Sequence, residues 1–466
     1  MRQLTTFEVD GNTSIDEDQQ ESPTVADNAS TISVKVVTRT KALMMVVILV
    51  CLLAVIVVVI VTSNAFIGNE EEEDESNILR ASTVVAGSFF FCAIVLPLNG
   101  VKCWGIGNYG QMGNGKLGDA SFPDSVVGLE RDVRSLCSGA VHSCAVDKRG
   151  AVKCWGANSD GKLGIDLSTP VAKTPVQVEG LSAGALSVTC GGFHSCALLE
   201  NKTAVCWGYN GHGQLGSGAV GLHSYVPQRV AGLINVDFVA GGTYSTCAVV
   251  NASTQTYCWG HNGYGELGSQ NLTLDSRARY VPVRVDPDYS SFGAGETIKA
   301  VEGGYYSFCG IQGSAGRLFC VGSNLNYQIG DASTRYFIGT INPVIGFDNG
   351  TVAVSPSKYS NRVCAVLNSG EARCWGLFRP ESCCVGNGTG DVIARVPVRV
   401  AGEFDHRSIA VGKSAACSIR GRRREVWCWG KNHHGQLGNG TTKPFYDLAA
   451  LVPQPVMVAA VNGTAD

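Results

Sequence analysis

Charged side chains are scarce in this sequence: Asp, Glu, Lys and Arg together make up 16% of its residues, and the formal net charge is −3. A nucleic-acid-binding face needs a surplus of Lys and Arg, so we expect no nucleic-acid partner. Metalloprotease HExxH and phosphate-binding GxxxxGK[ST] motifs are missing as well. We therefore expect no cofactor and no enzymatic activity. Glycine, by contrast, is abundant at 58 residues, which favours an all-β fold of short strands and tight turns.

One long apolar segment, Ala42 to Val61, contains no charge, proline or glycine. Twenty helical residues span about 30 Å, the thickness of a bilayer core. A signal peptide is the alternative, but its apolar stretch would be shorter and closer to the N-terminus. Roughly forty residues precede this segment, so we predict an uncleaved transmembrane signal anchor at residues 42–62.

Positive charge precedes the apolar segment and negative charge follows it: Lys35, Arg39 and Lys41 lie before it, and an acidic run spans residues 70–75. Because basic flanks stay in the cytoplasm, we predict a single-pass type II membrane protein whose C-terminal part is extracellular or luminal. The expected parts are a disordered cytoplasmic tail (1–41), the transmembrane anchor (42–62), an acidic spacer (63–78) and a domain at 79–461. A cation or partner site is the alternative for the acidic run.

Several N-x-Ser/Thr triplets follow the apolar segment and are candidates for glycosylation on that side of the membrane. They begin at Asn201, Asn251, Asn271, Asn349, Asn387, Asn439 and Asn462. Asn12 and Asn28 begin triplets in the predicted cytoplasmic tail, where we expect them to stay unmodified.

Residues 79–461 contain seven copies of one repeat of about fifty residues. Each copy has a Gly-rich start, an apolar strand, a second strand ending in Trp-Gly, an NxxGQLG-like turn and a Pro-Val strand. Six copies contain Cys-Trp-Gly, and the fifth has Cys320-Val321-Gly322. Repeated sets of short strands are typical of propeller blades, so we predict a seven-bladed β-propeller. The terminal strands, near Leu79 and Val461, could complete a shared blade.

The elements GGxHSCAL, VxCWG and NxxGQLG resemble the repeat of the regulator-of-chromosome-condensation superfamily, over roughly residues 80–461. The resemblance implies a seven-bladed propeller. The cysteine-bearing version also resembles the extracellular repeats of crinkly-type plant receptor kinases and secreted bacterial propellers, including a β-lactamase-inhibitor protein. The superfamily's founding nuclear member implies guanine-nucleotide exchange or GTPase regulation as an alternative function. The predicted topology disfavours it, because the propeller would lie on the wrong side of the membrane.

Each copy carries two cysteines, ten or eleven residues apart, in its two central strands. Facing residues of a hairpin lie within disulfide range, so we predict seven disulfides inside the blades; unoxidised core cysteines are the alternative. The pairs are Cys92 with Cys103, Cys144 with Cys154, Cys196 with Cys206, Cys247 with Cys258, Cys309 with Cys320, Cys364 with Cys374 and Cys417 with Cys428. Cys137 and Cys190 occupy nearly equivalent places in neighbouring copies and could approach each other near the axis. With Cys383 and Cys384 they allow three pairings, and the sequence does not choose among them.

Residues that recur at one position of the repeat are expected to be structural. The tryptophans of the Trp-Gly positions should pack between blades and not form a ligand cage. His142 and His194 each lie two residues before a strand cysteine and should hydrogen-bond a neighbouring turn. His433-His434 would need further ligands to bind a metal, and Cys383-Cys384 is weak evidence for a redox or metal motif.

Copies four to six depart most from the repeat, and departures are where a repeat scaffold presents a binding surface. Copy four is followed by a long insertion at residues 269–296. The candidate partner-binding residues are Tyr305, Tyr306, Tyr327, Phe378 and Arg379, since Tyr and Arg are enriched at interface hot spots. A degenerate, solvent-facing sector is the alternative. We expect a non-catalytic module that binds a protein or a glycan; the ligand, the organelle and the oligomeric state stay open.

Overall fold

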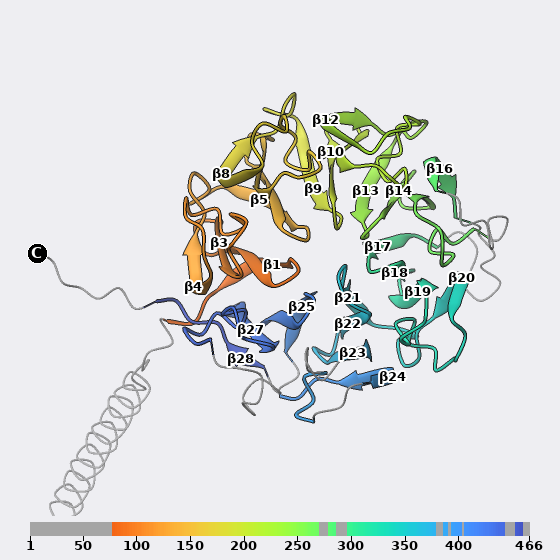
Figure 1. Cartoon of the computed structure of the whole chain (residues 1–466). Coiled ribbons are helices and arrows are strands. Elements are labelled where there is room, and N and C mark those ends of the chain that lie inside the picture. The colour runs from red at the N-terminus through yellow and green to blue at the C-terminus, as the bar shows by residue number, and fades with distance from the viewer. Residues whose placement is uncertain are drawn as a thin grey trace, which may run out of the picture. The chain divides into compact units, whose positions relative to one another are not determined.

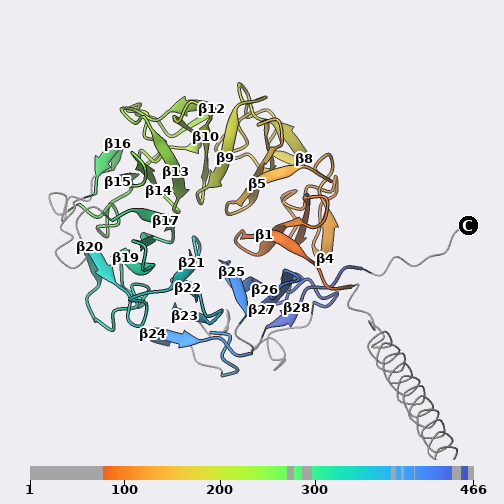
Figure 2. The same cartoon turned by 180° about the vertical axis from the view of Figure 1, so that it is seen from behind.

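The computed structural model describes residues 77–269, 278–285, 296–378, 385–389, 393–402, 405–442 and 453–459. These residues form seven antiparallel sheets of four strands each, arranged in a ring around a central axis (Figure 1; Figure 2). Each sheet is one blade, and its strands follow one another in chain order. The predicted all-β, seven-bladed propeller is confirmed.

The first three blades contain strands β1 to β12. Their bounds are β1 (Ala81–Ala86), β2 (Phe90–Val95), β3 (Gly100–Gly105), β4 (Ala120–Ser125), β5 (Val133–Ser138), β6 (His142–Asp147), β7 (Val152–Ala157), β8 (Val171–Gln177), β9 (Ala185–Cys190), β10 (His194–Leu199), β11 (Ala204–Tyr209) and β12 (His223–Arg229).

The other four blades contain strands β13 to β28. Their bounds are β13 (Val236–Gly241), β14 (Ser245–Val250), β15 (Gln255–Gly260), β16 (Arg279–Arg284), β17 (Ile298–Gly303), β18 (Ser307–Gln312), β19 (Arg317–Ser323), β20 (Phe337–Pro343), β21 (Thr351–Pro356), β22 (Arg362–Leu367), β23 (Ala372–Leu377), β24 (Ile393–Arg399), β25 (His406–Val411), β26 (Ala415–Arg420), β27 (Glu425–Gly430) and β28 (Gln454–Pro455). Strand β16 lies inside residues 269–296, so this segment is not simply an insertion but supplies the outer strand of blade four.

The position of a strand within its blade explains its composition. First strands surround the axis and fourth strands form the rim (Figure 1). Second strands are flanked by strands within the sheet and by the neighbouring blades, so all six residues of β14 are buried. The rim strand β12 is largely exposed and contains Pro227, as expected where a strand edge needs no further ladder bond.

Blades one, two, three, four and six are each fastened to the preceding blade of the ring by the tryptophan of the third strand. The indole nitrogen of Trp155 donates a 2.9 Å hydrogen bond to the main-chain oxygen of Gln111, in the turn after β3. The same bond, at 2.9–3.0 Å, joins Trp104 to Gln436, Trp207 to Lys162, Trp259 to Gln214 and Trp375 to Gln328. All six tryptophans of the Trp-Gly positions are fully buried. Their predicted role in packing between blades is confirmed.

The NxxGQLG-like turn is shaped to receive this indole. In blade three, Asn210 Oδ1 accepts a 3.1 Å hydrogen bond from the backbone nitrogen of Leu215, whose side chain is buried. Gly216 has a φ of 66°, and a Cβ there would lie 2.5 Å from the indole nitrogen of Trp259 in blade four. A glycine is therefore needed both for the left-handed backbone and for the close approach of the next blade.

A ring of hydrogen bonds encircles the axis at the turns between the first and second strands, which we name the axial turns. Six backbone bonds of 2.8–3.3 Å run from Lys413 N to Ser88 O, Ser88 N to Ala140 O, Ala140 N to Gly192 O, Gly192 N to Gly242 O, Thr243 N to Gly304 O, and Tyr305 N to Ser357 O. Between blades six and seven, the hydroxyl of Ser357 donates to the Gly412 carbonyl at 2.9 Å. Every blade is thus hydrogen-bonded to both neighbours beside the axis.

Consecutive blades are joined by a short linker with a recurring pattern. After blade one, Leu129 N donates to Val126 O at 3.2 Å, and Val101 N donates to Leu129 O at 2.8 Å. Val126 N donates in turn to Val101 O at 3.0 Å. The side chains of Val126 and Leu129 are both buried, so the linker contributes to the core between blades one and two.

The ring closes through the same linker, divided between the two ends of the domain. Leu79 N donates to Val456 O at 2.8 Å, and Val426 N donates to Leu79 O at 2.9 Å. Val456 N donates to Val426 O at 2.8 Å, so Leu79 takes the place of Leu129 and Val456 that of Val126. The four strands of blade seven all come from the C-terminal end. The two ends therefore complete a split linker and not a shared blade.

The predicted tail, the anchor at 42–62 and nearly all of the acidic spacer lie outside the described residues. Within the residues that are described, no helix is both long enough and apolar enough to cross a bilayer.

We expect Leu79→Ala to destabilise the propeller as much as the equivalent change in an intact linker, Leu129→Ala. Both side chains are at most 3% exposed, and Leu→Ala in a packed core costs about 2–5 kcal/mol. Urea unfolding of the two variants and the parent chain measures this. A Leu79→Ala variant with parental stability, beside a destabilised Leu129→Ala variant, would show that the split linker does not close the ring.

Candidate functional site

The two cysteines of each blade face each other across its central hairpin. All seven pairs are in register, joined as disulfides, with Cα atoms 4.0–4.1 Å apart. The bonds join Cys92 to Cys103, Cys144 to Cys154, Cys196 to Cys206, Cys247 to Cys258, Cys309 to Cys320, Cys364 to Cys374 and Cys417 to Cys428. All fourteen cysteines are buried at 3% exposure or less. The structure thus brings them together as the sequence predicts, and each bond ties the second strand of a blade to the third.

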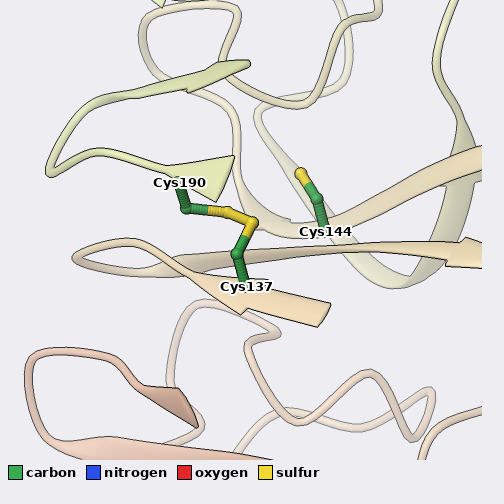
Figure 3. A group of neighbouring side chains, drawn as sticks. All are labelled: Cys137, Cys144 and Cys190. Carbon is green, nitrogen blue, oxygen red and sulfur yellow. A yellow bond between two sulfur atoms is a disulfide. The ribbon is translucent and has the colours of Figure 1, made fainter. Parts of the chain in front are cut away.

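An eighth disulfide joins two blades. Cys137 at the end of β5 bonds Cys190 at the end of β9, with a Cα separation of 5.4 Å (Figure 3). This selects one of the three pairings that the sequence left open; Cys383 and Cys384 lie outside the described residues. Cys144 lies beside this bond, and the three sulfur atoms are within 4.8 Å of one another. Metal ligation requires thiolates, whereas all three sulfurs belong to disulfides. Cys137 is bonded to Cys190, and Cys144 is bonded to Cys154.

His142 and His194 connect neighbouring blades through a hydroxyl group. His142 Nε2 lies 3.0 Å from Ser195 Oγ, which donates to the carbonyl of Lys162, the acceptor of the Trp207 indole. The Ser195 proton is used for that carbonyl, so His142 must donate from Nε2. His194 repeats the arrangement with Thr246 and Gln214. Both histidines reach the turn through the hydroxyl of the next blade and not directly.

Burial makes these two histidines resist protonation. Loss of hydration lowers the pKa of His194 to about 3, helped by the positive charge of Lys358. Burial lowers the pKa of His142 well below its ordinary value, with a further contribution from Lys162. Neither side chain is exposed, which places both in the scaffold of the ring and not in a reactive site.

The described glycosylation candidates lie at the surface. Asn201, Asn251 and Asn349 are exposed, and Asn387 and Asn439 are half-buried in turns. Asn387 and Asn439 accept hydrogen bonds of 2.8 Å from the hydroxyls of the threonines two residues later. Asn271 and Asn462 lie outside the described residues.

The segment from Gly180 to Gly184 matches the GxSxG motif of serine hydrolases. In those enzymes the serine lies at a sharp turn from a strand into a helix. Here the segment is the linker between β8 and β9, so the context that activates the serine is not the one found.

A continuous set of aromatic rings crosses blades three, four and five, on the axial turns and the nearby turns after the third strands. We name it the aromatic track; its members are Phe193, Tyr209, His212, Tyr244, His261, Tyr264, Tyr305 and Tyr306. Phe193 stacks on Tyr244 with centroids 5.2 Å apart, and Tyr244 stacks on Tyr306 at 5.8 Å. Every member is half-buried, so each ring is held in place with part of its surface open.

Tyr306 is the centre of the aromatic track. Its ring lies 4.9 Å from those of His261 and Tyr264 and 4.5 Å from that of Tyr305. Burial, followed by the neighbouring Tyr305, raises the pKa of Tyr306, so its hydroxyl stays protonated. The buried carboxylate of Glu266 accepts from His261 Nδ1 and from the backbone nitrogen of Tyr264, the latter at 2.9 Å. This fixes both rings against Tyr306.

Two tyrosines of blade five have a left-handed backbone. Tyr306 has a φ of 55° and Tyr327 a φ of 62°. Tyr327 occupies the place held by Gly213 in blade three, where glycine adopts this conformation without cost. Bulky residues at such positions cost about 1–3 kcal/mol and cluster at functional sites. The guanidinium of Arg395 lies 4.8 Å from the Tyr327 ring, which extends the aromatic surface toward blade six.

The structure brings together Tyr305 and Tyr306, places Tyr327 nearby, and excludes Phe378. Phe378 is 2% exposed and lies in the core of blades five to seven, under the guanidinium of Arg362. This burial disfavours Phe378 as a residue in direct contact with a partner. Arg379 lies outside the described residues. The aromatic surface spans blades three to five, one blade earlier than the predicted sector.

Most of the aromatic track was missed by sequence reasoning that looked for departures from the repeat. Phe193, Tyr244 and Tyr306 occupy one repeat position, directly before the second strand, which is also held by Phe89. Aligning the seven copies at that position would have shown the row of rings, since the axial turns place it beside the axis.

Beside the aromatic track lies the mouth pocket, a cavity of about 550 Å³ over the axis. Its lining includes Phe193, Tyr244, Tyr305, Lys358, Arg362 and Lys413. Lys358 Nζ reaches across the axis and donates to the carbonyl of Cys190, and Thr243 donates to the Lys358 carbonyl. Burial lowers the pKa of Lys358, and the negative charge of Glu302 opposes this shift. Glu302 lines the channel below the pocket.

Family models of the "Regulator of chromosome condensation (RCC1) repeat" match this sequence. One matches residues 101–146, 149–198, 206–249 and 425–463, and a second matches residues 133–162 and 186–214. The chain thus contains RCC1 repeats. The seven blades and their tryptophan turns are the structural form of that repeat, and the predicted resemblance is confirmed.

Curated relatives include human "Probable E3 ubiquitin-protein ligase HERC6", 31% identical over 52% of this chain and 23% of that protein. Human "E3 ubiquitin-protein ligase HERC2" is 28% identical over 77% of this chain and 7% of that protein. "RCC1 domain-containing protein RUG3, mitochondrial" from Arabidopsis thaliana is 32% identical over 33% of this chain and 35% of that protein. The chain thus spans about a third or less of the length of these relatives.

Solved RCC1-repeat structures share the fold. Human WBSCR16 aligns with a TM-score of 0.64 at 19% identity, covering 76% of this chain and 93% of that one. Prp20p from Saccharomyces cerevisiae aligns with a TM-score of 0.63 at 18% identity, covering 82% of this chain and 88% of that one. The ectodomain of the receptor kinase CR4 from Physcomitrella patens has a TM-score of 0.44, too low to single out the extracellular type.

We expect acid to destabilise the RCC1-repeat propeller through its buried histidines. The folded pKa of His194 is about 3 and its ordinary value is 6.5, so the unfolded chain binds the proton more readily. The stability that neutral His194 provides is present above pH 6.5 and is lost as pH falls toward 3. His194→Gln should reduce the slope of unfolding free energy against pH by up to about 1.4 kcal/mol per pH unit near pH 5.

Urea unfolding at pH 7, 6 and 5 measures this slope. The variant His223→Gln, at an exposed position of β12, is the control. An identical slope in the parent chain and His194→Gln would show that His194 does not couple protonation to folding.

Proposed function

We propose that this protein is a single-pass type II membrane protein whose propeller binds another protein on the extracytosolic side, without catalysis. The observation that carries the binding role is the aromatic track, in which eight half-exposed rings from three blades form one continuous surface. Tyrosine supplies large, rigid contact area at low entropic cost and is enriched at binding hot spots.

Two further features support protein binding. Blade five holds Tyr306 and Tyr327 in left-handed conformations, and such backbone strain clusters at functional sites. Among RCC1-repeat structures, Prp20p is described with its binding properties to Gsp1p and histones, and yeast RCC1 (Prp20) has been solved bound to Kap60. Propellers of this type therefore present protein-binding surfaces. The partner of this chain would be selected by its own aromatic track, not by the surfaces of those relatives.

The membrane assignment is supported by the sequence of residues 42–62 and its flanking charges. The eight buried disulfides of the described residues support an extracytosolic location of the propeller, since such bonds persist in oxidising compartments. A glycan partner and GTPase regulation are the alternatives. Regulation of a cytosolic GTPase would require the propeller on the cytoplasmic side.

Protease treatment of sealed microsomes tests the topology. We expect the propeller to be protected until detergent is added, because the lipid bilayer would separate it from the protease. Loss of mass on glycosidase treatment is also expected, since N-x-Ser/Thr triplets on the extracytosolic side are candidates for glycosylation. Asn201→Gln and Asn251→Gln together should reduce that loss. A propeller digested without detergent would refute the extracytosolic location.

Crosslinking on intact cells tests the binding surface. We expect the double variant Tyr264→Ala, Tyr305→Ala to lose at least about tenfold in partner capture, since a single hot-spot side chain contributes about 2 kcal/mol or more. The control is Tyr336→Ala, which removes a 73%-exposed tyrosine of blade five outside the aromatic track.

Melting temperatures of both variants establish that the blades still fold. Equal partner capture by the parent chain, the control and the folded double variant would exclude the aromatic track as the contact surface.

A further inference from the structure

The mouth pocket owes its shape to a difference in one axial turn. In six blades the turn closes with a backbone bond between residues three apart, such as Gly191 N to His194 O. In blade six of the ring the bond runs instead from Ser357 N to Arg362 O, two residues further along the chain. The additional length extends Lys358 across the axis and places Tyr359, Ser360 and Asn361 in the wall of the pocket.

Positive charge converges on this pocket, and Glu302, the acidic residue that interacts with Lys358, lies in the channel below it. Lys358, Arg362 and Lys413 line it, together with hydroxyl, amide and aromatic groups, and no aspartate or glutamate belongs to the described lining. Lys413 is exposed, and its ammonium lies 5.0 Å from the centre of the Phe89 ring. Arg362 is oriented by a 3.1 Å bond from Nε to Ser360 Oγ. Ligand pockets commonly combine such aromatic walls with a few placed polar groups.

The pocket opens onto the aromatic track. Phe193, Tyr244 and Tyr305 belong to both, and from Tyr305 the rings continue through Tyr306 to Tyr264 in steps of 4.5 and 4.9 Å. A cationic pocket at one end and a line of rings leading away from it suit an extended ligand with an acidic group followed by apolar or aromatic groups. A compact sugar would fill the pocket and leave the line of rings unused.

We propose that the mouth pocket binds a carboxylate side chain of an extended acidic segment of the partner protein, whose following residues lie along the aromatic track. This inference rests on the proposed protein-binding function and names the chemistry of the partner. The ammonium groups of Lys358 and Lys413 hold the carboxylate, and the tyrosine rings select for the neighbouring side chains.

The test measures fluorescence anisotropy of labelled peptides with the full chain in detergent micelles. The probe is a short acetylated and amidated peptide of alternating glutamate and tyrosine, compared with its glutamine-tyrosine counterpart. We expect the glutamate peptide to bind roughly tenfold more tightly, as a charged hydrogen bond provides. Lys413→Gln and Lys358→Met should each remove most of that preference, and Lys413→Arg should retain it.

The matched control is Lys148→Gln, which removes an exposed lysine in the turn between β6 and β7, away from the axial turns. Melting temperatures verify the fold of each variant, Lys358→Met above all. Equal binding of the glutamate and glutamine peptides, with loss of both in Tyr264→Ala, Tyr305→Ala, would overturn the carboxylate pocket and leave the aromatic track as a binding surface. Failure of both peptides to bind would also overturn the proposal. So would displacement of the labelled glutamate peptide by sialyllactose at a lower concentration than the unlabelled glutamate peptide requires.

Discussion

The hydrogen bond from a buried indole to the backbone of the preceding blade is the interaction on which this propeller depends. A blade of four short strands cannot bury both of its faces alone. The indole of Trp155 fills the space between blades one and two, and its single donor finds the Gln111 carbonyl, so no polar group is stranded. Around this contact the turn must supply a glycine with no side chain and an asparagine that holds the turn shut.

The interface between blades four and five departs from this rule. Blade five has Val321 where the other blades have tryptophan, so its third strand offers no indole to the turn of blade four. That turn carries Glu266 in place of the usual glutamine, and its buried carboxylate is bonded to His261 and to Tyr264 N. The rings of His261 and Tyr264 in blade four contact the ring of Tyr306 in blade five across this interface. The surface suited to a partner is therefore built where the standard contact between blades is missing.

The repeat made the architecture predictable, because a motif that recurs seven times must form one unit seven times. The cysteine pairs followed from the same periodicity, since a spacing of ten or eleven residues across a hairpin leaves little choice of partner. The exposed surface was less predictable. Phe378 belongs to a divergent segment and looked like a loop residue, yet it packs under Arg362 in the core. The position of Lys358 could not be predicted from the sequence. The two additional residues of its axial turn matter only because the folded ring places that turn beside the axis.

The split linker has a consequence for how the chain is made. Leu79 is synthesised before every strand of the propeller and Val456 after all of them, yet the two are hydrogen-bonded in the finished ring. While the chain leaves the ribosome, blade one therefore lacks its contact with blade seven. Its half of the linker stays unmatched until the last strand appears. Blades can form one after another, but the ring locks in a single late step that joins the oldest and the youngest parts of the domain.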